Sequence, residues 1–410
     1  MTYQEAIDWL YELQLLGSKL GLENPRQLAA LAGNPHQSIK IIHVAGTNGK
    51  GSVCAMLENI YRAAGYKTGL CTSPHLVSFR ERIQVNREPI AEQEVVRLTE
   101  CAQALLRTFP AEQPPTFFEV ITVMALEHFA RARCDIVLLE TGLGGRLDAT
   151  NIVTPIATVI TPIALDHQQY LGETLAQIAA EKAGILKKGI PALSAPQPPE
   201  ARAVLEKTAP ITFVDAEHAT ALAGKHQRQN AALAATTVGA LQNTMPVKTE
   251  SIETGLANVH WPARGQVFER DGRKLLLDAV HNPASAEALR GVLAELHSEQ
   301  RPTLMLGVLA DKNWEQMVGV LAPVARRIVC VPVSSERILP PDELAEECRK
   351  QNDCEVVAAP SLENGLAVVA KDDFVVITGS IYLLGEAMKF LGLAGAVDEP
   401  DLNEWKMSRP

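Results

Sequence analysis

The sequence lacks the features that would mark a membrane, secreted or nucleic-acid-binding protein. No run approaches about 18 uninterrupted apolar residues, so we expect no membrane-spanning helix. Residues 1–20 carry early acidic residues and lack the basic start and apolar core of a signal peptide. Acidic residues outnumber basic ones by 48 to 38, and the net charge of −10 excludes an ordinary basic nucleic-acid-binding protein.

The sequence also lacks a cysteine framework. The 7 cysteines are odd in number and form no Cys-x-x-Cys pair. Neither a disulfide scaffold nor a zinc site fits this set, so we expect reduced thiols and a cytoplasmic protein. No low-complexity tract and no repeat of about 20–50 residues is present.

What is present indicates a folded protein of more than one domain. The chain has 410 residues, of which 47% are hydrophobic. At about 100–200 residues per domain, this length predicts two or three domains. A change in composition near Pro262 and a hairpin-like turn at Asp271-Gly272 indicate where one domain ends. The expected domains are residues 1–262 and 263–410.

Short apolar runs alternate with helical patterns along most of the chain. Residues 3–33 have apolar residues at helical spacing and are expected to form a helix, which Asn34-Pro35 ends. The alternation predicts βα units and a mostly parallel sheet, hence an α/β fold. The expected strands are 39–44, 136–139, 158–161, 275–277, 303–308, 328–333 and 374–378; the expected helices include 53–64, 118–131, 284–296 and 362–370; and the proline-rich stretch 191–199 is expected to be a turn or loop.

The strongest motif is Gly46-Thr47-Asn48-Gly49-Lys50-Gly51-Ser52. It follows a predicted strand and opens a predicted helix, as a phosphate-binding loop does. Glycines let backbone N–H groups face phosphate oxygens, and the helix N-terminus adds partial positive charge. Lys50 would reach the terminal phosphates. Only two residues separate Gly46 from Gly49, fewer than in the common GxxxxGK[ST] loop, so a tight strand–helix turn that contains a lysine is the alternative.

This loop and its context resemble a known family. The stretch His43–Ser52 is similar to the nucleotide loop of folylpolyglutamate synthase and dihydrofolate synthase, members of the Mur ligase superfamily. The resemblance runs from about residue 3 to about residue 394. It implies an N-terminal phosphate-loop ATPase domain, with a mostly parallel sheet flanked by helices, and a smaller C-terminal Rossmann-like α/β domain. The further motifs, in order, are TSPHL (72–76), ERI (81–83), LETGLGGRLDATN (139–151), ALDH (164–167), EKAGI (181–185), DAVHNP (278–283), ADK (310–312) and TGS (378–380).

The resemblance implies a nucleotide site with Mg²⁺. A carboxylate such as Glu140, at the end of an apolar strand, can hold Mg²⁺ through oxygen, although it could instead cap the glycine turn that follows. His167 is a less usual Mg²⁺ ligand and could be an ordinary loop histidine. By resemblance, Ser73, Glu140 and His167 bind the ATP-linked Mg²⁺. The ATP-binding residues implied are Thr47, Asn48, Gly49, Lys50, Gly51, Ser52, Asn230, Arg264 and Asp278.

The resemblance assigns an unusual role to Lys182. A lysine in a helix is ordinarily a solvated surface residue. In this superfamily the matching lysine is carbamylated by CO₂ and can help to hold a second Mg²⁺ or to orient the acceptor. Carbamylation needs a neutral amine, which burial can supply by lowering the pKa.

Two substrate sites are implied by the same resemblance. Phe117 or Phe118 could stack on a flat heteroaromatic ring, although both could equally be core residues of the next helix. Arg82 could meet the substrate or be a surface charge. Lys19 stands where bifunctional relatives often carry aspartate, which weakens the case for dihydropteroate. The implied folate-binding residues are Arg82, Thr116, Phe117, Phe118, Glu119, Leu147, Asp148 and Ala149, and the implied glutamate-binding residues are Asp278, His281 and Ser380.

The predicted activity is that of an ATP-dependent ligase, with Lys50, Lys182 and His281 as catalytic residues. It would add L-glutamate to the carboxylate of tetrahydrofolate, with dihydropteroate as a second acceptor to be tested, through an acyl phosphate. By resemblance we expect ATP, Mg²⁺ at two sites, K⁺ as a monovalent cation, and a monomer with small-molecule substrates and no nucleic acid or membrane. The alternatives are a Mur-type ligase for another carboxylate and a non-catalytic nucleotide-binding protein.

Overall fold

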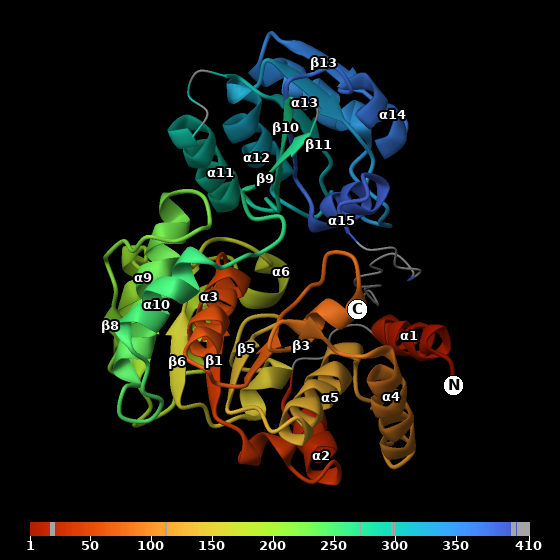
Figure 1. Ribbon diagram of the computed structural model, residues 1–410. Helices are drawn as coiled ribbons and strands as arrows, with labels where there is room; N and C mark the ends of the chain where they lie inside the picture. Colours follow the sequence, from red (N-terminus) through yellow and green to blue (C-terminus); the bar gives the residue numbers. More distant parts are fainter. Residues whose placement is uncertain are drawn as a thin grey trace. The chain divides into compact units, whose positions relative to one another are not determined.

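The chain divides into two compact units, each built on its own sheet (Figure 1). The structure is a computed structural model that describes residues 1–16, 21–110, 113–270, 272–296, 298, 300–394 and 399. The first unit comprises Met1–Ala221 and Gln229–Val259. The second comprises Leu222–Arg228 and the described residues from His260 to Glu399. The predicted two-domain α/β fold with mostly parallel sheets is confirmed, while residues 262 and 263 as the functional boundary remain a prediction.

The first unit is organised around an eight-stranded sheet of order β4-β3-β2-β5-β1-β6-β7-β8. Six of its strands run parallel, and β3 and β4 pair antiparallel at one edge. Its strands are β1 Ile41–Ala45, β2 Thr68–Cys71, β3 Ile83–Val85, β4 Glu88–Pro89, β5 Ile136–Glu140, β6 Ala157–Ile160, β7 Ala192–Ser194 and β8 Thr212–Phe213.

Helices cover this sheet on both faces, which explains why β1, β5 and β6 are buried along their whole length. Helix α3 packs on β1, β2 and β5, and α10 packs on α3 (Figure 1). The helices, in chain order, are α1 Tyr3–Glu12, α2 Glu23–Leu31, α3 Lys50–Ala63, α4 Glu92–Leu106, α5 Phe117–Arg131, α6 Gln168–Leu171, α7 Leu175–Ala183, α8 Pro199–Thr208, α9 Lys225–Ala240 and α10 Thr249–Ala257, with short 3₁₀ turns at Leu13–Leu16, Pro35–Ser38, Phe79–Arg82 and Ala149–Ile152.

Two predictions for this unit were wrong. The helix expected over residues 3–33 is two helices, α1 and α2, because Pro25 is compatible only with the first turn of a helix and therefore requires a new start at Glu23. The stretch 191–199, expected to be a turn or loop, contains strand β7 and the start of α8. Its apolar centre is buried between β6 and β8, and its prolines lie outside the paired residues.

The second unit has a six-stranded sheet of order β13-β12-β11-β14-β10-β9. The strands are parallel except β9, which forms the predicted hairpin with β10; Asp271 in its turn lies outside the described residues. Its core gathers apolar residues of the central strands and helices, among them Leu276, Leu304 and Phe374. The elements are β9 Gln266–Arg270, β10 Arg273–Asp278, α11 Pro283–Leu296, β11 Thr303–Leu306, α12 Trp314–Leu321, a 3₁₀ turn at Ala322–Val324, β12 Arg327–Cys330, α13 Pro341–Gln351, β13 Glu355–Ala358, α14 Leu362–Val368, β14 Phe374–Thr378 and α15 Ile381–Phe390.

Two findings bear on the composition-based expectations. All seven cysteines carry free thiols. Within the described residues, none of the helices combines the length and the apolar character that a bilayer crossing requires.

Candidate functional site

The predicted phosphate loop lies between β1 and α3, as the sequence indicates. Gly46 has φ 150° and Gly49 has φ 89°. A side chain on Gly46 would collide with the Oγ1 atom of Thr161, and one on Gly49 would lie 3.0 Å from the amide of Asn230. Both positions therefore require glycine, one for a close approach and the other for a left-handed backbone.

The loop is braced by the turn that follows β6. The N–H groups of Thr47 and Asn48 donate to the carbonyl of Pro162, at 3.0 and 3.2 Å. The hydroxyl of Thr47 donates to the Ala164 carbonyl and accepts from the Ala164 N–H, both at 3.1 Å. These two loop N–H groups thus bind protein, so the capacity of the motif for anions resides at the start of α3.

Helix α3 begins at Lys50 with Gly49 as its N-cap. The first bond of its ladder runs from the Val53 N–H to the Gly49 carbonyl, at 2.9 Å, so the N–H groups of Lys50, Gly51 and Ser52 precede the ladder. Lys50 bends back to donate to the Thr47 carbonyl at 3.2 Å. A cation and a helix N-terminus meet at one place, an arrangement suited to phosphate groups.

Lys182 is buried beside this loop, contrary to what a helical lysine usually does. Its side chain is 4% exposed, and its Nζ atom donates to the Gly46 carbonyl at 2.8 Å. Burial, and then the positive charge of Lys50, lower the pKa of Lys182 to about 7, while Asp166 and Asp148 oppose this shift. The amine is therefore neutral in a substantial fraction of molecules near neutral pH.

Glu140 ends β5 next to the loop. It pairs in register with Val44 of β1, and its side chain is 5% exposed. Its Oε2 atom accepts a hydrogen bond from the backbone N–H of Ser73 at 3.1 Å. The structure thus brings Ser73 and Glu140 together, two residues with hard oxygen donors at the carboxyl edge of a parallel sheet.

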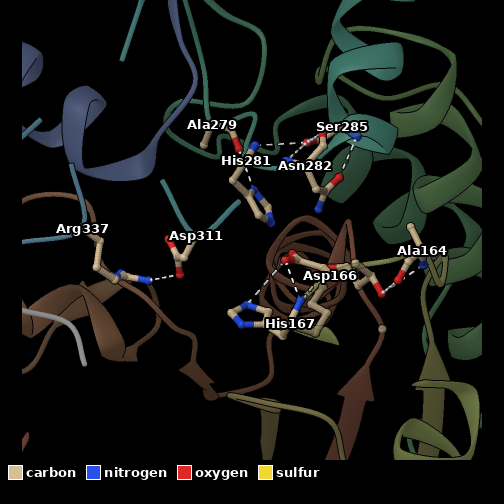
Figure 2. Close-up of polar contacts among 12 residues, drawn as sticks. Ala164, Asp166, His167, Ala279, His281, Asn282, Ser285, Asp311 and Arg337 are labelled. Carbon is tan, nitrogen blue, oxygen red and sulfur yellow. Dashed lines mark hydrogen bonds and ion pairs between the residues drawn. The ribbon is translucent and has the colours of Figure 1, made fainter. Parts of the chain in front are cut away.

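His167 lies in the turn that leads to α6, with φ 51° (Figure 2). Its backbone N–H donates to the Asp166 carboxylate at 2.9 Å, and its Nε2 atom is 3.9 Å from the same carboxylate. The imidazole is 39% exposed, whereas the Asp166 side chain is 7% exposed. Among the described residues, no group of three or more His, Cys, Asp or Glu side chains is positioned to hold a metal ion.

Arg82 is buried rather than a surface charge. Its side chain is 4% exposed, and its Nε atom donates to the Nδ1 atom of His75 at 2.7 Å. Its guanidinium carbon lies 5.4 Å from the centre of the Phe117 ring. Phe117 is nearly buried, while Phe118 is half-buried with its ring against Gly142, where a β-carbon would not fit.

The polar residues of the predicted folate segments serve local structure. Thr116 and Glu119 form the capping box of α5: the Thr116 N–H donates to the Glu119 carboxylate at 2.6 Å, and the Glu119 N–H donates to the Thr116 hydroxyl at 3.5 Å. Asp148 accepts from the Leu143 N–H at 2.8 Å and the Thr150 N–H at 3.0 Å. The roles predicted for these side chains in substrate binding therefore compete with roles in holding the loops.

Asp148 stands at the end of a buried polar chain. Burial raises its pKa, and the hydrogen bonds it accepts oppose the shift. The Thr150 hydroxyl donates to Asp148, and the Nε2 atom of His43 lies 2.8 Å from that hydroxyl. Leu147, which is half-buried, and Ala149, which is buried, flank Asp148; Lys19 lies outside the described residues.

Three predicted residues of the second unit cluster at the end of β10. The Gly265 N–H donates to the Asp278 carboxylate at 2.7 Å. Burial raises the pKa of Asp278 to about 6, against the opposing effects of Arg264, this N–H group and His281. Arg264 also donates to the Ala263 carbonyl at 3.2 Å. A carboxylate with an arginine and a histidine nearby can receive a charged amino group.

The cap of α11 is Asn282 and not His281 (Figure 2). The Asn282 side-chain oxygen accepts from the Ser285 N–H at 2.9 Å, and Asn282 is buried. The Nδ1 atom of His281 lies 3.1 Å from the Ala279 carbonyl, so Nδ1 carries the proton and Nε2 is left as the acceptor. Ser380 is 2% exposed, and its hydroxyl accepts from the Tyr382 N–H at 3.2 Å, capping α15.

Sequence reasoning missed several residues that shape the site. Thr161 and Pro162 contact the phosphate loop, and Asp166 lies close enough to influence the pKa of Lys182. His75 is hydrogen-bonded to Arg82, and His43 to Thr150. Their partners are 7 to 116 residues away in sequence. His75 and Asp166 lie within motifs already singled out, which was the available signal.

Family models match two parts of the chain. The Mur ligase middle domain matches residues 44–194, and the Mur ligase glutamate ligase domain matches residues 263–381. The first match contains the phosphate loop, Ser73, Glu140, His167 and Lys182. The second contains Arg264, Asp278, His281 and Ser380.

Whole-chain comparisons give related proteins that match over nearly the full length of both chains. The dihydrofolate synthase/folylpolyglutamate synthase of Bacillus subtilis is 33% identical, over 95% of this chain and 99% of that protein. The crystal structure of folylpolyglutamate synthase from Thermotoga maritima superposes with a TM-score of 0.83 at 33% identity, over 97% of this chain and 98% of that one. Folylpolyglutamate synthase of Mycobacterium tuberculosis, complexed with ADP and AMPPCP, gives 0.85 at 31% identity, over 95% and 99%.

Proposed function

The chain belongs to the folylpolyglutamate synthase/dihydrofolate synthase family of Mur ligases, and from this premise we propose that it is an ATP-dependent ligase that adds L-glutamate to the carboxylate of tetrahydrofolate. Dihydropteroate is tested as a second acceptor. One observation carries the proposal. At the carboxyl edge of one sheet lie Lys50, the N-terminus of α3, Glu140 and the buried Lys182.

The first step of the proposed reaction activates the acceptor. A carboxylate is a poor electrophile, so its oxygen attacks the γ-phosphorus of ATP, giving an acyl phosphate and ADP. Lys50 and the N–H groups at the start of α3 bind the phosphates and stabilise the charge that develops on them. Thr47, Asn48, Gly49, Gly51, Ser52, Asn230, Arg264 and Asp278 are the further proposed nucleotide-binding residues.

The second step forms the amide. The amine of L-glutamate attacks the acyl carbon, and the tetrahedral intermediate expels inorganic phosphate. Asp278, His281 and Ser380 are the proposed glutamate-binding residues, and the Nε2 atom of His281 is oriented as an acceptor by the bond at Nδ1. That atom can take the proton that the attacking ammonium group must lose. Residues 1–262 would then be the ATP-binding domain and 263–410 the glutamate-ligase domain.

Mg²⁺ fits the donors present at the first unit's sheet edge. Ser73 and Glu140 supply hard oxygen atoms, as Mg²⁺ prefers, and His167, in the turn after β6, is the third proposed ligand. When bound, Mg²⁺ would neutralise charge on the phosphates. K⁺ is proposed as a monovalent activator on family grounds alone.

Lys182 is proposed to carry a carbamate. Its lowered pKa supplies the neutral amine that attack on CO₂ requires, and the product is an anion with two oxygen atoms. The amine loses one proton in this reaction, and the N–H that remains can still donate to the Gly46 carbonyl. The two oxygen atoms could hold a second Mg²⁺ or orient the acceptor. An unmodified amine could do neither.

The acceptor is proposed to bind through residues of three segments of the first unit. Phe117 and Phe118 offer aromatic faces, and Arg82 offers a buried positive charge. Leu147, Asp148 and Ala149 form a loop in which Asp148 and Ala149 are buried. Thr116 and Glu119 hold the start of α5 and so place Phe117. We further propose that the protein acts as a monomer in the cytoplasm, where its seven thiols stay reduced.

The proposal is tested by ADP release with MgATP and L-glutamate. One reaction contains tetrahydrofolate, a second dihydropteroate and a third neither, and product masses are read afterwards. Turnover with tetrahydrofolate, with one glutamyl unit gained, supports the proposal; turnover with dihydropteroate as well makes the enzyme bifunctional. Lys50→Met should abolish turnover, whereas Lys188→Met, which removes an exposed lysine, should not. Folded protein that binds ATP but turns over neither acceptor would overturn the proposal.

A further inference from the structure

Arg82 is a buried cation whose charge is left uncompensated. It is 4% exposed, and buried arginines are ordinarily paired with a carboxylate. Within the described part of the chain, no carboxylate lies at ion-pair distance from Arg82, and Nε is the only guanidinium nitrogen with a protein acceptor. The two terminal nitrogens are therefore available to an anion.

The loop that carries Arg82 uses the carboxylate of the preceding residue, Glu81, for its own folding. Glu81 accepts hydrogen bonds from the backbone N–H groups of Leu76, Val77 and Ser78, at 2.8, 2.9 and 2.8 Å. The carboxylate therefore serves to fold the loop, and the backbone of Arg82 is tied in as well, because its carbonyl accepts from the Thr72 N–H at 3.2 Å. These hydrogen bonds hold the loop around an arginine that it does not neutralise.

Arg82 is instead held by a neutral imidazole. Because an arginine always carries its protons, the Nδ1 atom of His75 must be unprotonated to accept from Nε at 2.7 Å. The ring proton then resides on Nε2, which lies 3.3 Å from the hydroxyl of Tyr11 and donates to it. A neutral acceptor fixes the direction of the guanidinium without cancelling its charge.

Tyr11 connects the two groups that hold Arg82. Its hydroxyl accepts from His75, and its ring lies 5.8 Å from that of Phe117, over which the guanidinium is placed. The ring of Phe79 packs against both Phe117 and His75, with centroids at 6.3 and 6.5 Å. Tyr11 itself is placed by α1, whose Ala6, Ile7 and Leu10 are fully buried.

We propose that His75 and Tyr11 are positioning residues that hold Arg82 as an uncompensated cation for an anionic group of the acceptor substrate. This inference rests on the proposed function, because it assigns the anion to the carboxylate-bearing acceptor. His75 specifies the direction of the guanidinium, and its neutrality preserves the charge that the acceptor meets. Neither residue touches the substrate.

The matched pair His75→Asn and His75→Asp tests this charge argument. The two side chains have the same shape and both present an oxygen near the position of Nδ1, but only aspartate neutralises Arg82. We expect His75→Asn to keep the acceptor KM within about threefold of the wild type, since a neutral acceptor is retained. His75→Asp should raise the acceptor KM about tenfold to a hundredfold, while the KM for ATP stays unchanged.

Tyr11→Phe provides a second, milder variant. It removes the partner of His75 Nε2 but keeps the ring against Phe117, so we expect a rise of about twofold to fivefold in the acceptor KM and little change in kcat. Equal losses in His75→Asn and His75→Asp would overturn the inference, because a purely structural role does not distinguish the two side chains.

A spectroscopic measurement keeps the inference testable if a variant fails to fold. In ¹⁵N-histidine-labelled wild-type protein, His75, assigned by its absence in His75→Asn or by sequential labelling, should show an unprotonated Nδ1 and a protonated Nε2. A protonated Nδ1 would overturn the inference whatever the activity. A wild-type chain that turns over neither acceptor would overturn the proposed function instead, so the two failures are distinguishable.

Discussion

At the scale of single residues, burial sets the chemistry of Lys182. Removal of water disfavours the ammonium form, and the nearby charge of Lys50 adds to that effect. The carbonyl of Gly46 accepts from Nζ, so the amine is held in place as well as partly deprotonated. Of the residues proposed for catalysis, this one depends most on its surroundings.

We expect carbamylation of Lys182 to increase as pH rises through about 7. At a pKa of about 7, roughly a tenth of the amine is neutral at pH 6 and roughly nine tenths at pH 8. With ¹³C-bicarbonate, NMR should show one carbamate signal that grows over this range and disappears in Lys182→Arg. The exposed Lys188 is the control, and Lys188→Arg should leave the signal unchanged. A signal that survives Lys182→Arg would contradict the assignment.

His43 links the stability of the fold to pH. Burial lowers its pKa from 6.5 to about 3, so between these values the unfolded chain binds a proton that the folded chain excludes. Its contribution to stability is complete above pH 6.5 and is lost as pH falls toward 3. By pH 4 the loss is on the order of a few kcal/mol.

The measurement is the free energy of unfolding from urea titrations at several pH values. His43→Gln keeps a donor near the Thr150 hydroxyl but cannot be protonated, so its stability should fall less steeply with acid than that of the wild type. His218→Gln, which alters a partly exposed histidine, should follow the wild-type curve. Parallel curves for His43→Gln and the wild type would exclude the linkage.

At the scale of elements, the junction of β1 and α3 does most for nucleotide binding. Strand β1 leads into the phosphate loop, where Gly46 and Gly49 leave room for the side chains of Thr161 and Asn230. Helix α3 begins directly after the loop, at Lys50. Because two loop N–H groups donate to Pro162, the loop has little freedom to adjust. Substitutions at this junction should therefore affect ATP before they affect the other substrates.

Gly46→Ala tests this junction directly. The new methyl group would collide with Thr161, and the residue would be forced into a backbone region that alanine avoids. We expect a loss of at least about tenfold in ATP affinity and of about 2–4 kcal/mol in stability. Gly239→Ala in α9, where a β-carbon meets open space, should leave ATP affinity unchanged. Calorimetric titration with AMPPCP measures the nucleotide affinity of both variants. Normal affinity in Gly46→Ala would refute the close-approach argument.

At the scale of the whole molecule, two features set the behaviour of the chain. It is folded as two compact units with separate cores, and it carries a net charge of −10 although ATP and folates are anions. Steering by overall charge is therefore unfavourable, and local cations such as Lys50 and Arg82 must attract the substrates. Separate cores also allow the units to unfold at different temperatures.

We expect two calorimetric transitions, of which AMPPCP raises the one that belongs to the first unit. At a ligand concentration of about 100 times Kd, the stabilisation is about 2.7 kcal/mol. Phe129→Leu and Phe374→Leu, each in one core, identify the transitions by lowering one of them selectively. Lys50→Met should remove the shift. A single transition lowered equally by both core variants would contradict independent units.

The sequence by itself determined the family, the α/β fold and the phosphate loop, because these depend on contiguous residues and on apolar periodicity. Strands such as 136–139 and 374–378 were predictable because parallel strands buried on both faces consist of apolar runs. Only the tertiary structure decided that Lys182 is buried against Gly46 and that Arg82 is held by His75 and Tyr11. Burial and hydrogen-bond partners depend on segments that are distant in sequence, so no local pattern records them.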